Sequence, residues 1–207
     1  LTDLYLGDDA SYTENQLTQI DDIKINSFSS IEQILDQLLD NKIIGVCRGR
    51  MEMGQRALGN RSIICDPRNI QNVEKINDSI KNRDFWMPFA PIILDEYQDV
   101  LIENPKKLES PHMTIAFETK NGKELIPASV HRSDGTARAQ LLKKSVNPEL
   151  WNLIYNFYEK TGIPAVLNTS LNLHGYPIVR TIDDALHVFQ NSKLDLLWLE
   201  NHIIEKN

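Results

Sequence analysis

The sequence predicts an α/β fold in which helices flank a mixed β-sheet. Short apolar runs rich in β-branched residues, at 43–47 and 165–167, alternate along the chain with segments whose apolar residues recur at helical spacing, at 31–39 and 148–158. Such alternation is typical of α/β architecture. The length of 207 residues suffices for one substantial domain and is too short for two ordinary ones.

The other elements follow from the same periodicities and from residues that start or stop helices. Ser29 and Glu32 form a capping-box pattern before the first helix. Pro148 fits the first turn of a later helix, and Gly162 fits the position just past its end. Further strands are expected at 63–65, 89–94, 113–119, 137–142 (a candidate partner of 113–119) and 194–199, and further helices at 69–80, 100–101 and 181–189. The first 26 residues have weak periodicity, which indicates a linker or an ordered arm.

Composition narrows the class of protein. The hydrophobic fraction of 41% and the charged fraction of 25% are those of a soluble globular protein. No apolar run approaches the length of a membrane span, and the N-terminus is acidic rather than signal-like. Cys47 and Cys65 form neither a disulfide framework nor a metal spacing, and the five histidines show no metal spacing either. We therefore expect a reduced, cytoplasmic protein without a protein-ligated metal.

Positive charge is concentrated in one part of the chain. The net charge is −7, which argues against a general nucleic-acid binder. Residues 48–83, however, carry +4 (eight basic and four acidic residues) and hold six of the nine arginines, so the rest of the chain carries −11. These arginines alternate with glycine and small residues, and arginine suits phosphate and carboxylate oxygens. The window therefore predicts an anion site; a solvated charged face is the alternative.

Within this window, the loop 54–62 invites comparison with a phosphate-binding P-loop. A P-loop needs Lys and then Ser or Thr after its second glycine, where this chain has Asn60 and Arg61, so the sequence argues against a P-loop NTPase. The loop could still bind an anion through backbone N–H groups and through Arg56 and Arg61. A structural loop in which the glycines only permit turns is the alternative.

Three further polar segments are candidates for ligand binding. Lys81-Asn82-Arg83 ends a predicted helix, where cations are favourable in any protein. The segment 131–138 turns into a strand and contains Arg138, the strongest binding candidate there, and His131, for which a structural role is the alternative. The segment 168–172 follows a predicted strand, where α/β sheets hold ligands, although such residues also make ordinary turns.

Several motifs, which follow one another along the chain, resemble those of a known family. They are Gly49–Ser62 with Asp66-Pro67-Arg68 after it, Pro88-Phe89-Ala90-Pro91, Asp134-Gly135-Thr136-Ala137-Arg138, and Asn168-Thr169-Ser170-Leu171-Asn172. Together they resemble the C-terminal region of NodU/CmcH-type O-carbamoyltransferases and cover most of the chain from about Lys42 to Phe189. The pairs Lys81-x-Arg83 and Ser170-x-Asn172 also resemble those of the YrdC-like fold, found in threonylcarbamoyl-adenylate synthases and hydrogenase-maturation carbamoyltransferases.

The resemblance implies both an architecture and an activity. Residues 27–207 would form a YrdC-like domain with a twisted mixed sheet and a basic concave face, and residues 1–26 would connect it to an N-terminal domain of the actin-like ATPase class. The domain would convert carbamoyl phosphate and ATP, with magnesium held mainly by the ATP, into carbamoyl-adenylate. The N-terminal domain of the family carries a histidine metal motif, and this motif has no match here. The chain alone would therefore perform only this half-reaction.

The resemblance also assigns roles to single residues. Lys81, Arg83 and Arg138 would contact phosphate and carbamoyl oxygens, and Ser170 and Asn172 would hydrogen-bond the reacting group. The expected nucleotide-binding residues are Arg50, Arg56, Arg61, Asn168 and Thr169. A non-catalytic module that binds a nucleotide or RNA is the alternative function, and the overall acidity counts against RNA.

Overall fold

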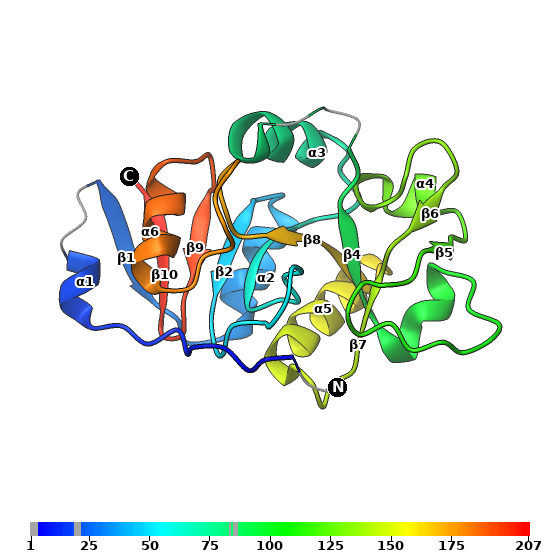
Figure 1. The fold of residues 1–207 in the computed structure, drawn as a ribbon, viewed down its shortest axis with the longest axis horizontal. Helices are drawn as coiled ribbons and strands as arrows, with labels where there is room; N and C mark the ends of the chain where they lie inside the picture. Colours follow the sequence, from blue (N-terminus) through cyan, green and yellow to red (C-terminus); the bar gives the residue numbers. More distant parts are fainter. Residues whose placement is uncertain (1–3, 19–21, 83, 85–86) are drawn as a thin grey trace.

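An eight-stranded mixed sheet forms the centre of the structure, a computed structural model that describes residues 4–18, 22–82, 84 and 87–207 (Figure 1). Across this sheet the order is β1 (Ile23–Ser27), β10 (His202–Lys206), β9 (Leu196–Trp198), β2 (Ile44–Cys47), β3 (Arg61–Cys65), β8 (Ala165–Ser170), β4 (Ala90–Leu94) and β7 (Gln140–Leu142). Two pairs are parallel, β2 with β9 and β4 with β7, and the other pairs are antiparallel. A second, two-stranded sheet pairs β5 (Phe117–Glu118) with β6 (Thr136–Ala137).

Helices cover both faces of the large sheet. α2 (Ile31–Leu39) and α5 (Pro148–Thr161) pack on one face, and α3 (Gln71–Ile76) and α6 (Ile182–Gln190) pack on the other. Two shorter helices, α1 (Glu14–Thr18) and α4 (Gly122–Leu125), complete the described helices. Side chains alternate across a strand, so Ile44 and Val46 of β2 share one core with α2 and α5. Cys47 belongs to the opposite core, which packs against α3 and α6. The expected α/β class with a mixed sheet flanked by helices is therefore confirmed.

Some predicted boundaries differ from those of the structure. The capping residue of α2 is Ser30, not Ser29, because the helix begins at Ile31 and its third residue, Gln33, completes the capping box with Ser30. The Gln33 side chain accepts hydrogen bonds from the backbone N–H groups of both Ser29 and Ser30. The strand predicted at 113–119 is reduced to β5, and the strand predicted at 137–142 is divided between β6 and β7. Only the first residue of that segment, Ala137, pairs with β5, while β7 joins the edge of the large sheet.

The two outermost strands at the other edge were not predicted. β1 and β10 pair with each other, and their sequences, Ile-Lys-Ile-Asn-Ser and His-Ile-Ile-Glu-Lys, are short and partly polar. β1 is the edge strand of the sheet, and an edge strand buries less of its surface, so its alternation is weak in the sequence. β1 lies partly within the first 26 residues, and β10 hydrogen-bonds it to β9 and so to the rest of the sheet.

The helix predicted at 69–80 changes its type before it ends. The α-helix α3 stops at Ile76, and Asn77–Lys81 forms one π-helical turn that Asn82 closes with a left-handed backbone (φ 41°). Inserted π-turns occur frequently at functional sites. Here the turn brings the side chain of Lys81 to the end of β8.

Both cysteines are buried and unpaired. Burial raises the pKa of the Cys47 thiol to about 12 and raises that of Cys65 as well. The thiolate is the reactive form of cysteine. We therefore expect neither thiol to react with a disulfide reagent such as Ellman's reagent near neutral pH until the chain unfolds. Reaction of either thiol at the rate of a free thiol in the folded protein would contradict this burial.

Candidate functional site

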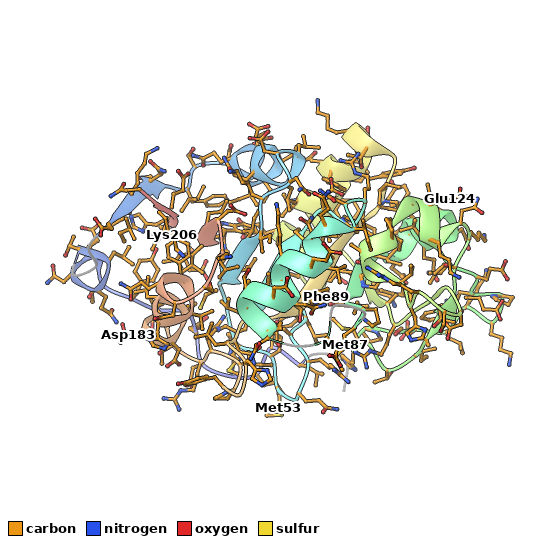
Figure 2. All side chains as sticks on the ribbon, turned by 90° about the horizontal axis from the view of Figure 1, so that it is seen from above. Met53, Met87, Phe89, Glu124, Asp183 and Lys206 are labelled. Atoms are coloured by element: carbon orange, nitrogen blue, oxygen red, sulfur yellow. The ribbon has the colours of Figure 1, made fainter. Side chains whose placement is uncertain are left out.

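A cleft with two lobes opens beside the end of β8 and the start of β4. The lobes share Pro88, Phe89, Ala90 and Arg138. The inner lobe, of about 130 Å³, is completed by Gln55, Arg56, Ala57, Met113, Asn168, Thr169 and Ser170. The outer lobe, of about 230 Å³, is completed by Ala116, Ser129, His131, Asp134 and Thr136. Figure 2 shows Phe89 near the centre of the view, whereas Met53, on the loop between β2 and β3, lies at the lower edge of the molecule.

Two arginines give the inner lobe a positive charge. Arg56 comes from the loop between β2 and β3, and Arg138 directly follows β6. None of the described residues that line the inner lobe is acidic. Partial burial lowers the pKa of Arg138, and the charge of Arg56 lowers it further. An anion bound between the two guanidinium groups would relieve this repulsion.

Next to the inner lobe, Lys81 holds the turn that follows β8. Its Nζ atom lies 2.6 Å from Ser170 O and 3.2 Å from Ser170 Oγ. It lies 2.6 Å from Asn172 Oδ1 and 3.2 Å from Asn172 O. Ser170 Oγ also donates to Asn172 Oδ1 at 2.6 Å. The structure thus brings these three predicted residues into one hydrogen-bonded cluster, and Ser170 is the member that lines the cleft.

The end of β8 contributes the other predicted polar residues. Asn168 and Thr169 line the inner lobe, and Asn168 Nδ2 donates to Ala57 O at 2.8 Å. This bond ties the loop that carries Arg56 to the sheet. Asn168 is 1% exposed, so its side chain forms the floor of the lobe rather than its mouth.

The loop 54–61 surrounds a carboxylate of the protein itself, that of Glu52, rather than leaving its amide groups open to a ligand. The carboxylate oxygen Oε1 of the buried Glu52 accepts backbone N–H bonds from Leu58 at 2.6 Å, from Asn60 at 2.7 Å and from Arg61 at 3.2 Å. The Gly59 N–H donates to Ser62 Oγ. These four amide groups are therefore occupied, which does not agree with a phosphate cradle made of this loop's backbone.

Gly59 shows how closely this loop is packed. Its φ of +118° lies in the region that L side chains rarely adopt, and a Cβ atom there would meet Leu150 Cδ2 at 2.3 Å. A side chain at this position would therefore push the loop away from α5.

Two of the predicted nucleotide-binding arginines lie away from the cleft. Arg61 is fully buried, and its guanidinium group donates to the backbone oxygens of Asp8, Arg48, Gly49 and Asn60. Arg50 donates to Leu6 O and Gly7 O. Both side chains hold the chain in place around the loop, and neither lines the lobes described above. Arg83 lies outside the described residues.

The outer lobe contains a histidine and a carboxylate in contact. His131 Nδ1 lies 3.2 Å from Asp134 Oδ1 and 2.9 Å from Ser133 Oγ. Hydrogen bonds from the Thr136 backbone N–H and hydroxyl lower the pKa of Asp134. Asp134 therefore stays ionised near neutral pH and orients both His131 and the turn that leads to Arg138.

Sequence reasoning missed two residues that support this site. Glu52 is an acid within an arginine-rich loop, and its isolation among basic residues was the available signal. Tyr5 lies in a segment of weak periodicity, but its hydroxyl donates to Leu58 O at 2.8 Å, which only the folded chain reveals.

Two properties of the described residues bear on membranes and metals. No helix in the described ranges has the length and apolar character that a membrane crossing requires. Within the same ranges, no three or more histidine, cysteine or acidic side chains gather where they could hold a metal ion.

Comparison with known proteins places the chain in a family. Residues 35–206 match the family model described as the carbamoyltransferase C-terminus. The chain is 45% identical to the uncharacterized protein MJ1051 of Methanocaldococcus jannaschii over 84% of its own length and 33% of that protein. It is 34% identical to the nodulation protein NolNO of Sinorhizobium fredii over 97% of its length and 30% of that protein. The chain therefore spans about a third of the length of these relatives.

A solved structure has a similar fold. Full-length HypF in its phosphate- and nucleotide-bound form matches 89% of this chain and 22% of the HypF chain, with a TM-score of 0.56 and 14% identity. This likeness concerns the fold alone. The family model, which covers most of the chain, confirms the resemblance found in the motifs. The chain belongs to the carbamoyltransferase C-terminal family.

Proposed function

We propose that this domain activates a carbamoyl group by adenylation. Carbamoyl phosphate and water give carbamate and inorganic phosphate. A carbamate oxygen then bonds to the α-phosphorus of ATP while the bond to the β-phosphate bridge oxygen breaks, which gives carbamoyl-adenylate and pyrophosphate. The observation that carries this proposal is the cationic pair Arg56 and Arg138, which faces no acidic residue in the described lining of the inner lobe.

Family membership supports the carbamoyl part of the proposal, and a structural neighbour is consistent with the nucleotide part. The chain belongs to a carbamoyltransferase family, and the similar HypF was solved with phosphate and a nucleotide bound. Both substrates are anions, so a site that holds them together must offset their repulsion. Preorganised cations in a partly dehydrated cleft do this and also stabilise charge that builds on phosphoryl oxygens.

Each residue of the cleft has a role in this proposal. Arg56 and Arg138 hold phosphoryl or carbamoyl oxygens from two sides, which also keeps the reactants close. Ser170 and Thr169 line the inner lobe, and each carries a hydroxyl group that could hydrogen-bond a reactant. Lys81 and Asn172 position Ser170 through the cluster at the end of β8. We keep Arg83 in the proposed site because of its motif. Arg50 and Arg61 instead stabilise the loop between β2 and β3 by donating hydrogen bonds to backbone oxygens.

Magnesium is expected to enter with ATP rather than to occupy a site of this chain. The described lining of the two lobes offers one carboxylate, Asp134, which already accepts hydrogen bonds from Thr136. Magnesium prefers several oxygen ligands and keeps much of its water. The described residues that line the two lobes therefore do not fit a magnesium site.

Transfer to the final acceptor is assigned to another part of a longer protein. The relatives are about three times as long as the matched region. We propose that a preceding domain passes the carbamoyl group to a hydroxyl acceptor and that this domain supplies the adenylate.

Replacing Lys81 by methionine tests the role of the cluster at the end of β8. The substitution keeps the bulk but removes the ammonium group from Ser170 and Asn172, so we expect adenylate formation to fall about tenfold to a hundredfold, which corresponds to one charged hydrogen bond. Mass spectrometry of the products made from ATP and carbamoyl phosphate measures it. Lys75, exposed on α3, provides the control Lys75→Met, which should leave the rate unchanged. Equal rates for both variants would remove Lys81 from the proposal.

A further inference from the structure

The N-terminal arm, defined here as residues 4–10, lies along the loop that follows β2. It is the dark blue trace below the sheet in Figure 1. Backbone hydrogen bonds pair it with this loop, from Gly7 N to Met51 O at 2.9 Å and from Met53 N to Leu4 O at 2.6 Å. These two bonds hold the arm against the folded domain.

One side chain of the arm reaches the loop that carries Arg56. The Tyr5 hydroxyl donates to Leu58 O at 2.8 Å, and Gln140 Nε2 donates to the same oxygen at 3.1 Å. Leu58 follows Arg56 by two residues, so fixing this carbonyl restricts where the Arg56 side chain can lie. Glu52 holds the same loop from inside through its amide groups.

The arm also supports the wall of the inner lobe. Leu4 and Tyr5 pack against a small apolar cluster made of Leu58, Ala90 and Met113. Two members of this cluster, Ala90 and Met113, line the inner lobe. The arm thus contacts the loop that carries Arg56 and packs against a cluster to which two lining residues of the inner lobe belong.

We propose that Tyr5 is a positioning residue for Arg56 and that the N-terminal arm keeps the ligand-free cleft in its binding shape. Arg56 and Arg138 repel each other when no anion is bound, so a loose loop would turn Arg56 away into solvent. A loop held beforehand avoids an ordering cost on binding. The identity of the ligand rests on the proposed function, while the positioning itself rests on the contacts above.

The test compares two tyrosines at the N-terminal end of the chain. Tyr5→Phe removes only the hydroxyl that holds Leu58 O. Tyr12→Phe removes a hydroxyl that bonds His202 Nδ1 at 2.7 Å, away from the cleft. In calorimetric titration with ATP and magnesium, Tyr5→Phe should weaken binding about fivefold, the equivalent of one neutral hydrogen bond. Tyr12→Phe should leave the affinity unchanged, and equal losses in both variants would overturn the proposal.

A double-mutant cycle separates positioning from a general loss of structure. If Tyr5 acts through Arg56, Tyr5→Phe should cause no further loss of affinity in a chain that already carries Arg56→Ala. A fivefold loss that persists in the Arg56→Ala chain would show that Tyr5 acts on something else.

Hydrogen exchange distinguishes failure of this inference from failure of the proposed function. Amides of residues 54–60 should exchange at least about fivefold faster in Tyr5→Phe than in wild type, whether or not ATP binds, and Tyr12→Phe should not change them. If wild type bound no ATP but this acceleration were seen, the positioning would stand and the ligand would be wrong. Unchanged exchange in Tyr5→Phe would overturn the positioning.

Discussion

Replacing Glu52 by alanine should destabilise the domain by about 3–5 kcal/mol, the largest effect we expect from a single substitution. The change leaves the N–H groups of Leu58, Asn60 and Arg61 without their acceptor in the interior. Each buried donor left unsatisfied costs about 1–3 kcal/mol. Urea denaturation followed by circular dichroism measures the free energy of unfolding.

A control and an isosteric variant make this result specific. Glu74 is exposed on α3, so Glu74→Ala should change the free energy of unfolding by no more than about 0.5 kcal/mol. Glu52→Gln keeps an acceptor oxygen and should cost less than Glu52→Ala. A loss below about 1 kcal/mol in Glu52→Ala would mean that water or another group replaces the carboxylate.

Replacing Arg138 by alanine should reduce adenylate formation by about a hundredfold or more while leaving the fold intact. Arg138 is exposed and lines both lobes, so its removal takes one of the two cations from the proposed reaction site. Removing one donor to a developing oxyanion costs about 3 kcal/mol in other enzymes, and we expect a similar loss here. The rate of product formation from ATP and carbamoyl phosphate measures the loss.

Arg132 gives a matched control in the same segment. It is exposed and contributes to neither lobe, so Arg132→Ala should retain the wild-type rate. Arg138→Lys keeps the charge but loses the planar fork of donors, and we expect an intermediate rate. A full rate in Arg138→Ala, with an unchanged circular dichroism spectrum, would remove Arg138 from the reaction.

The fold could be predicted where elements are buried and regular. The helix α5 and the strand β2 have strong periodicity because one or both of their faces enter the core, and both form as expected. Edge strands such as β1 carry little of this signal. The π-turn that ends at Lys81 has no signature in hydrophobic periodicity, because it depends on how the helix end meets β8.

The site could be predicted only in part, for a different reason. Motif positions show which residues are near each other along the chain, and five of the expected residues, Arg56, Arg138, Asn168, Thr169 and Ser170, do line one lobe. They do not show where a loop side chain points. Arg56 and Arg61 are five residues apart, yet one lines the cleft and the other is buried under backbone carbonyls.

Exchange of labelled pyrophosphate into ATP tests the central claim most directly, because it reports reversal of the adenylation step without any acceptor. We predict that the folded chain with magnesium catalyses this exchange only when carbamoyl phosphate is present. We also predict that the chain alone carbamoylates no hydroxyl compound. Exchange that does not depend on carbamoyl phosphate, or no exchange by a folded chain that binds ATP, would contradict the proposed adenylation.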